Sequence, residues 1–96
     1  MTRFVLSPRA RGDLDEIWAY TRKTWGTRQA EVYIRTIQAA VKAAATDPGI
    51  AKSCEHIRKG YFTYPAGSHT LFFRLTTDGI DVVRILHRKM DFKRHL

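Results

Sequence analysis

The sequence predicts a small α+β domain with the element order β-α-α-β-β-β, in which a helical hairpin packs on one face of a small, mainly antiparallel sheet. Two stretches with apolar residues every three or four positions, divided by Gly26, predict the two helices. After residue 57, β-branched and aromatic residues alternate with polar ones between short turn sequences, which predicts three strands. A chain of 96 residues is sufficient for one such domain, spanning residues 1–96, with a single modest core.

The first two elements are a short strand and a long helix. Residues 4–6 are apolar and predict the strand, and Ser7 followed by Pro8 predicts a helix start, with Ser7 as the N-cap and Pro8 at the first helical position. Gly26 is expected to end this helix. The side chains expected on its buried face are Ala10, Leu14, Ile17, Trp18, Thr21 and Trp25.

The second helix is expected to be capped by Thr27 and to end firmly at residues 47–49, Asp-Pro-Gly. The link at Gly26 is so short that the two helices must form an antiparallel hairpin. The apolar stripe of this second helix consists of Ala30, Ile34, Ile37, Val41 and Ala45.

The second half of the chain is predicted to be a loop followed by strands and turns: a loop at 50–57, a strand at 58–64, a turn at 65–68, a strand at 69–76, a turn at 77–79 and a strand at 80–87. Connections this short make the three strands antiparallel neighbours. The two helices can cover only one face of the sheet, so the other face is expected to be partly open.

The alternation of side chains along the last strand decides where its arginine lies. Val82, Arg84 and Leu86 point to one face if the strand is regular, and Val83 and Ile85 point to the other together with Asp81 and His87. With Val83 and Ile85 facing the helices, Arg84 is expected on the open face, where Arg74 could join it. An arginine in such an apolar run needs a partner or an open surface, because an unpaired buried charge is costly.

Composition places bounds on the function. Seventeen Lys and Arg against nine Asp and Glu give a net charge of +8, which favours polyanions or acidic protein partners. Cys54 is the one cysteine, which fits a reducing compartment. Neither a signal peptide nor a membrane span is recognisable, so we expect a cytoplasmic protein with no membrane partner.

Few residues offer chemistry. The four histidines have no metal-ligand spacing, and we expect neither a metal nor a cofactor. Asp13, Asp15 and Glu16 are interpreted as complementing the dipole of the first helix rather than as an acid–base group. One cationic group remains, with Arg74, Arg84 and His87 at its centre and Arg88 and Lys89 beside them. Arginines can stabilise phosphoryl transfer and a histidine can move a proton, but the favoured interpretation is a rim that binds acidic residues of a partner protein.

The ordered set of local sequences resembles the ParE toxins of the RelE/ParE superfamily, which belong to bacterial type II toxin–antitoxin systems. The resemblance covers nearly the whole chain, and it rests on residues 13–18, 25–26, 57–61, 66–69, 72–74 and 83–91.

The resemblance implies a toxin that inhibits DNA gyrase without being an enzyme and that is neutralised by a ParD-like antitoxin, through which alone it would meet operator DNA. Grooves of the helical hairpin suit an amphipathic helix of that antitoxin. The antitoxin-binding residues are expected to be Trp18, Trp25, Tyr33, Arg74 and Arg84. The C-terminal segment is linked to toxicity in this family, which points here to His87, Arg88, Lys89, Met90, Asp91, Phe92, Lys93 and Arg94.

Two alternatives stay open. The RelE branch cuts mRNA on the ribosome, and a chain of that type would use Arg74, Arg84 and His87 as catalytic residues. That branch uses basic residues and a late tyrosine or histidine, and here the last strand ends with His87 rather than with a tyrosine. No obvious lysine-rich helix follows the second helix. The weaker alternative is a nucleic-acid-binding module without toxicity.

Overall fold

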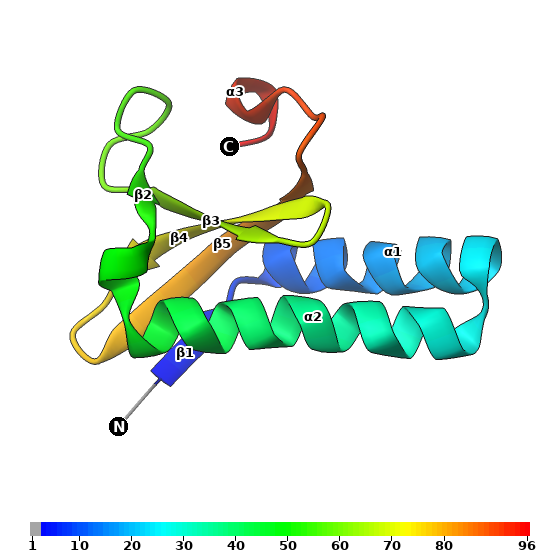
Figure 1. The fold of residues 1–96 in the computed structure, drawn as a ribbon. Coiled ribbons are helices and arrows are strands. Elements are labelled where there is room, and N and C mark those ends of the chain that lie inside the picture. Colours follow the sequence, from blue (N-terminus) through cyan, green and yellow to red (C-terminus); the bar gives the residue numbers. More distant parts are fainter. Residues whose placement is uncertain (1–2) are drawn as a thin grey trace.

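The computed structural model describes residues 3–96 and consists of one five-stranded sheet between a helical hairpin and a small C-terminal cap (Figure 1). The elements in chain order are β1 (Arg3–Leu6), α1 (Pro8–Trp25), α2 (Thr27–Thr46), a 3-10 turn (Pro48–Ile50), β2 (Lys52–Ser53), β3 (Phe62–Ala66), β4 (His69–Leu75), β5 (Gly79–His87) and α3 (Phe92–His95).

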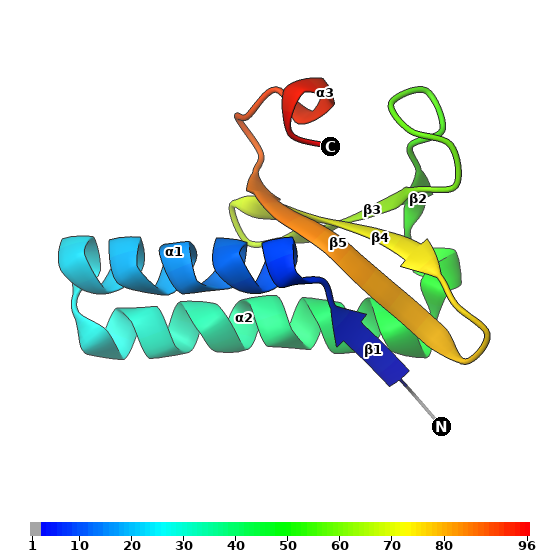
Figure 2. The same cartoon turned by 180° about the vertical axis from the view of Figure 1, so that it is seen from behind.

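The order of strands across the sheet is β1-β5-β4-β3-β2. Strand β1 pairs in parallel with β5, and the other neighbouring pairs are antiparallel. Figure 2, which shows the molecule from behind, makes the parallel pair visible. The predicted α+β class, the element order and the helical hairpin on one face are confirmed, with β2 and α3 as additional elements.

Ser7 joins the first strand to the first helix in the way the sequence predicts. Its Oγ accepts a hydrogen bond from the N–H of Ala10 at 3.1 Å, which caps α1, and Pro8 is the first helical residue. The same hydroxyl donates to the carbonyl of Val83 at 2.8 Å, so the cap also attaches the helix to β5. Gly26 ends α1 with a φ of 95°, as expected.

Four predicted boundaries are wrong. Thr27 does not cap α2, because it is already the first helical residue and Gly26 occupies the cap position without a side-chain hydrogen bond. The stretch predicted as a loop at 50–57 contains β2, and the strand predicted at 58–64 is β3, which begins only at Phe62. Pro65 lies within β3, and the turn is reduced to Gly67 and Ser68 because Ala66 already pairs with His69.

The side-chain alternation along β5 is broken by a β-bulge, which the sequence pattern does not reveal. Phe73 pairs with Val82, whereas the residue before it in β4, Phe72, pairs with Arg84. Val83 is therefore the extra residue of β5. Ile85 faces the helices as predicted, but Val83 does not. Val82 takes its place in the core, although the prediction had placed it on the opposite face.

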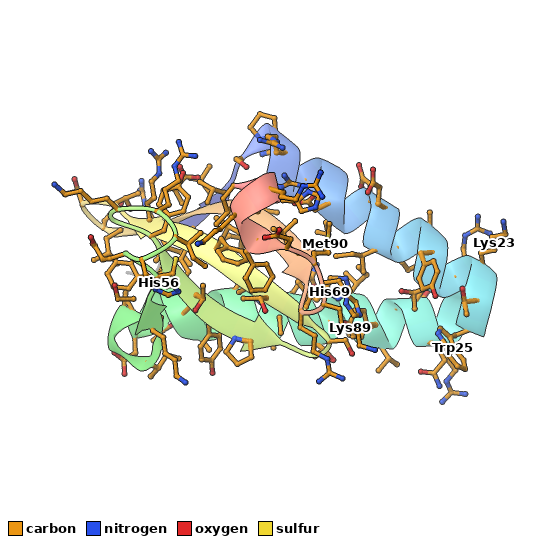
Figure 3. The ribbon with its side chains drawn as sticks, turned by 90° about the horizontal axis from the view of Figure 1, so that it is seen from above. Lys23, Trp25, His56, His69, Lys89 and Met90 are labelled. Carbon is orange, nitrogen blue, oxygen red and sulfur yellow. The ribbon has the colours of Figure 1, made fainter. Side chains whose placement is uncertain are left out.

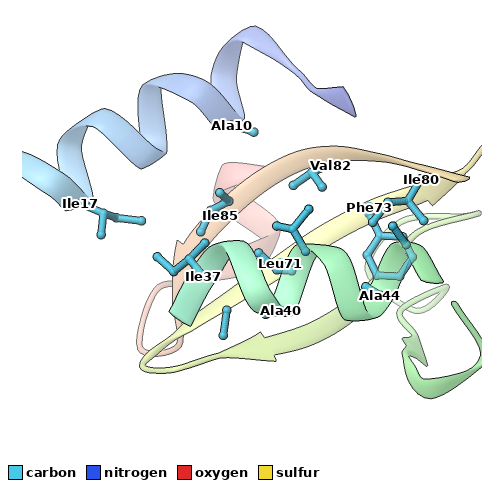
Figure 4. Packing of buried hydrophobic residues seen from close by; sticks show 13 residues of the cluster. Ala10, Ile17, Ile37, Ala40, Ala44, Leu71, Phe73, Ile80, Val82 and Ile85 are labelled. Carbon is cyan, nitrogen blue, oxygen red and sulfur yellow. The ribbon is translucent and has the colours of Figure 1, made fainter. Parts of the chain in front are cut away.

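The main core lies between the sheet and the helical hairpin, and Figure 4 shows it from close by. Small alanines of α2 allow the helix to lie close to the sheet, where large side chains of β4 and β5 fill the space. Its most buried members include Ala10, Ile37, Ala44, Leu71, Phe73, Ile80, Val82 and Ile85.

The opposite face of the sheet is not open, contrary to the prediction. A second cluster of Cys54, Phe72 and Leu86 is buried there, and the C-terminal segment (residues 88–96) covers it together with the segment that precedes β3. The ring of Phe92 meets Phe72 edge-on, with the ring centroids 4.7 Å apart. The surrounding half-buried side chains are Tyr61, Val83, Phe92 and Leu96.

Within residues 3–96, none of the helices combines the length and the apolar character needed to cross a membrane.

Candidate functional site

Arg84 is held by a nearly buried ion pair. Its Nε donates to Oδ2 of Asp13 at 2.8 Å and its Nη2 donates to Oδ1 at 2.8 Å, which is the bidentate arrangement that guanidinium groups favour. The two side chains are only 12% and 11% exposed. The hydrogen bond to Asp13 raises the pKa of Arg84 above its ordinary value, against the effect of burial. Arg84 also donates from Nη1 to the carbonyl of His95 at 2.8 Å, which connects the ion pair to the C-terminal segment.

Asp13 has a structural role that the helix-dipole interpretation did not include. Its Oδ2 accepts a hydrogen bond from the backbone N–H of Ile85 at 2.9 Å. Strand β1 pairs only with the first half of β5, up to Val82, so the second half of β5 has an edge without a neighbouring strand. Asp13 and Ser7 close part of this edge with side-chain hydrogen bonds, which is how a buried backbone group is satisfied without a further strand.

Arg74 lies in a different environment. Its Nη2 donates to Oδ2 of Asp81 at 2.7 Å across the β4–β5 pair, and the arginine side chain is 54% exposed. That hydrogen bond raises the pKa of Arg74. The two predicted rim arginines therefore each have a carboxylate partner within the chain, and together they do not form the free cationic site that was expected on an open face.

The helical hairpin extends beyond the end of the sheet (Figures 1 and 2). Residues of the hairpin and of the adjoining sheet end line a cleft there. It encloses about 470 Å³. Trp25 and Tyr20 stand at its rim, 69% and 68% exposed, which is unusual for large aromatic side chains without a partner. Its lining comes from α1, α2, the β3–β4 turn and the adjoining ends of β4 and β5: Tyr20, Thr21, Trp25, Gln29, Tyr33, Ser68, His69 and His87.

Three aromatic side chains form the floor of this cleft. Tyr33 Oη and His69 Nδ1 are 2.6 Å apart, and the N–H of Ser68 donates to the same hydroxyl at 2.9 Å. His69 pairs with His87 across β4 and β5, and their rings meet edge to face with centroids 5.2 Å apart. Burial first, and then the neighbouring imidazole of His87, lower the pKa of His69 from 6.5 to about 4, against the opposing charge of Asp13. His69 is therefore neutral at neutral pH.

The structure brings together only some of the residues predicted to bind an antitoxin. Trp25 and Tyr33 line the cleft, whereas Trp18 is half-buried and is not among the lining residues. His87, which was predicted to bind the target, lines the cleft as well. Figure 3 shows Trp25 at the far end of the hairpin and His69 close to Lys89 and Met90 at the end of the sheet. The sequence analysis assigned no role to His69. Continued without a bulge, the register of the Leu75–Ile80 pair would place His69 opposite Leu86. The bulge at Val83 moves it opposite His87.

The C-terminal residues expected to carry toxicity divide into structural and exposed ones. Phe92 packs on Phe72, and the side chain of Asp91 accepts a hydrogen bond from the N–H of Lys93, which caps α3. Asp91 is nevertheless exposed, and the other exposed members are Arg88, Lys89, Met90, Lys93 and Arg94.

Two further features bear on chemistry. Burial, with a smaller contribution from Glu55, raises the pKa of the Cys54 thiol, and a protonated buried thiol is a poor nucleophile. Within residues 3–96, His, Cys, Asp and Glu side chains nowhere gather in groups of three or more that could hold a metal ion.

Comparison with known proteins gives consistent results. The family model described as "ParE toxin of type II toxin-antitoxin system, parDE" matches residues 4–92. A protein named Toxin ParE1 from Mycobacterium tuberculosis is 51% identical over 96 residues, covering 99% of this chain and 98% of the relative. Toxin ParE1 from Caulobacter vibrioides is 38% identical and covers 100% of this chain and 99% of the relative.

Two solved structures share the fold. The chromosomal ParDE system from P. aeruginosa contains a chain that superposes with a TM-score of 0.78 at 20% identity, covering 91% of this chain and 96% of that one. A chain of the YoeB–YefM complex from Staphylococcus aureus gives a TM-score of 0.60 at 14% identity, covering 92% and 98%.

Proposed function

The chain belongs to the ParE toxin family and is the toxin of a type II ParDE toxin–antitoxin system, and from this premise we propose that it inhibits DNA gyrase in the cytoplasm and is neutralised by a ParD-like antitoxin. The proposal has two parts, an antitoxin-binding site and a target-binding surface, and different residues carry each of them. Operator DNA would be reached only through the antitoxin.

The observation that carries the antitoxin site is the cleft beneath the overhanging helices. Its rim offers Trp25 and Tyr20 as large exposed anchors, and its floor offers Tyr33 and the histidine pair as polar groups. An amphipathic helix that inserts its apolar face into a groove uses this combination of an aromatic rim and a few fixed polar groups. The net charge of +8 accelerates capture of an acidic segment.

Replacing Trp25 by Ala tests this site. The side chain is 69% exposed, so its loss should leave the melting temperature nearly unchanged. Binding to the antitoxin, measured by calorimetry, should weaken by about 30-fold or more if Trp25 is an interface anchor. Leu75→Ala is the matched control, since this apolar side chain is 54% exposed but belongs to the β4 end away from the cleft. Equal affinities of the Trp25 variant and the wild type would contradict the proposed site.

We further propose that the action on gyrase is non-enzymatic. A nuclease built on Arg74, Arg84 and His87 needs arginines free to stabilise a developing phosphate charge, but Asp81 and Asp13 hold the two arginines. Target contact is instead assigned to the exposed basic and apolar side chains that follow β5, Arg88, Lys89 and Met90, and to Lys93 and Arg94 on α3.

The purified chain should inhibit gyrase supercoiling and should leave mRNA intact on translating ribosomes. The double replacement Lys93→Ala and Arg94→Ala, at exposed positions of α3, should reduce gyrase inhibition while preserving antitoxin binding. Cleaved message together with unaffected gyrase would overturn the proposal in favour of the endoribonuclease.

A further inference from the structure

His69 and His87 each have one ring nitrogen engaged by the chain, and this fixes which nitrogen carries the proton. The hydroxyl of Tyr33 already accepts from the N–H of Ser68 at 2.9 Å, and its own proton has two acceptors in reach, His69 Nδ1 at 2.6 Å and the Ala66 carbonyl at 3.4 Å. The shorter contact assigns the O–H to His69 Nδ1. Because His69 is neutral at neutral pH, its Nε2 must then carry the N–H.

The same reasoning applies to the second imidazole. The backbone N–H of Lys89 donates to Nδ1 of His87 at 3.2 Å, so Nδ1 is an acceptor and Nε2 of a neutral ring is the donor. Among residues 3–96, neither Nε2 makes a hydrogen bond, and no buried side-chain nitrogen or oxygen lacks a partner. Both Nε2 atoms must therefore reach solvent, and the two rings line both the cleft beneath the helical overhang and a smaller neighbouring cleft of about 220 Å³.

We infer that the histidine pair is a carboxylate-binding site, which takes an acidic side chain of the antitoxin and takes up a proton when it does so. This inference rests on the proposed function, because it assigns a specific contact within the proposed antitoxin cleft. Two neighbouring ring N–H groups match the two oxygens of a carboxylate. A carbonyl oxygen could accept the same hydrogen bonds, but only a negative charge makes an additional proton on the pair favourable.

The charged groups around the pair are compatible with an anion. From α1, Asp13, Glu16 and Tyr20 line the smaller neighbouring cleft that the two rings also border, together with Arg84, which is paired with Asp13. From α2, Tyr33 is uncharged. The two residues that directly follow His87 in the chain, Arg88 and Lys89, are exposed cations. Of the two carboxylates near the pair, Asp13 is paired with Arg84, and Glu16 has no ion-pair partner in the described part of the chain.

The protonated state has a structural solution that leaves Tyr33 in place. A proton added at His69 Nδ1 makes this nitrogen a donor to Tyr33 Oη, and the tyrosine proton then turns to the Ala66 carbonyl at 3.4 Å. A bound carboxylate raises the pKa of His69 from its low value in the free chain. Proton uptake occurs at pH values between the free and the bound pKa, so affinity in that window rises as the pH falls.

A small-molecule probe tests the site itself. Indole-3-acetate combines a carboxylate with an aromatic ring that can meet the Trp25 rim, and indole-3-acetamide is the uncharged control. NMR titration of the His69 ring should show the pKa raised by about half a unit or more with the acid and unchanged with the amide. No change with the acid, or an equal change with both compounds, overturns the inference.

The antitoxin supplies a second test that separates the two proposals. Calorimetry in buffers of different ionisation enthalpy, between pH 4.5 and 6.5, just above the pKa of about 4 that His69 has in the free chain, should show proton uptake on binding by the wild type and much less by His69→Gln. The His87→Gln variant, in which the second donor changes and Tyr33–His69 remains, should bind more weakly and with a smaller pH dependence. Binding without proton uptake overturns the carboxylate contact with the antitoxin, whereas complete absence of binding overturns the proposed function.

Discussion

At the end of β5, the two sides of the sheet differ in whether other parts of the chain cover and pair their side chains. On the side away from the helices, the C-terminal segment covers Phe72 and Leu86, and Arg84 is bound by Asp13 and by the His95 carbonyl. On the helix side, His69 and His87 open into a cleft whose rim is exposed. Residues that are almost adjacent in the sequence therefore have different uses. Charged and aromatic side chains are structural where another part of the chain contacts them, and they are available for binding where none does, as beneath the helical overhang.

The largest expected effect comes from breaking the structural side. Arg84→Ala leaves the carboxylate of Asp13 nearly buried and unpaired, which should lower the free energy of unfolding by about 3–5 kcal/mol. Arg74→Ala removes an exposed ion pair on the same two strands and should cost less than about 1 kcal/mol. Urea unfolding of both variants makes the comparison. Similar losses for the two variants would mean that the Arg84–Asp13 pair has no special structural part.

The C-terminal segment offers a second test of that side. Phe92→Ala removes the ring that packs on Phe72 and should lower the free energy of unfolding by about 2–3 kcal/mol. This is at or below the lower limit for a fully buried phenylalanine, because Phe92 is only half-buried. Lys93→Ala, on the next residue of α3, is exposed and should have almost no effect on stability. If Phe92→Ala abolishes gyrase inhibition without changing the melting temperature, Phe92 contacts the target rather than the core.

On the cleft side, Gly67 determines whether Tyr33 can hold His69. Gly67 has a φ of 63°, and a Cβ there would lie 2.7 Å from Cε1 of Tyr33. Gly67→Ala should therefore cost about 2 kcal/mol through backbone strain and displacement of the ring. Gly60→Ala is the control, because its φ is 80° but a Cβ there would have no neighbouring atom within 4 Å, so this variant carries the strain alone. Equal melting temperatures for the two variants would show that the Tyr33 contact contributes nothing.

The smallest effect concerns pH. The folded state lowers the pKa of His69 to about 4, so the unfolded chain binds a proton more readily between that value and 6.5. This group should therefore reduce stability progressively as the pH falls from 6.5 to 4 and should have no influence above about 7. The reduction should be about 1–2 kcal/mol after allowance for partial solvent exposure. The loss of stability between pH 6.5 and 4 should be smaller by this amount in His69→Gln than in the wild type. Parallel stability–pH curves of the two proteins would contradict the prediction.

Much of the fold could be predicted because local chemistry determines it. The Ser7-Pro8 start, the Gly26 stop and the apolar stripes define the helices within the chain itself, and alternation on β4 correctly separates Phe73 from Phe72. The boundaries that failed involve weaker local signals. Thr27 has good capping chemistry, but the turn at Gly26 is so tight that Thr27 is already helical. Pro65 resembles a turn residue, yet β3 accommodates it within a strand pair.

The candidate site could be predicted only in part. Trp25 and Tyr33 were assigned to the antitoxin surface, and the structure places both in one cleft. The interpretation of Arg84 as a rim residue depended on an open face, which the C-terminal segment fills. The sequence analysis did not assign His69 to the site. The structure pairs it with His87 through a tighter β4–β5 turn followed by the bulge at Val83.

The sequence by itself determined the α+β class, the helical hairpin, the succession of strands and the basic charge, because periodicity, caps and turn residues act over a few neighbouring positions. Only the tertiary structure decided which charges remain free. Asp13 and Arg84 are 71 positions apart in the chain, and their pairing depends on α1 crossing the edge of β5 that β1 leaves unpaired. The bulge at Val83 then turns His87 toward His69, because one additional residue in a strand shifts the register beyond it.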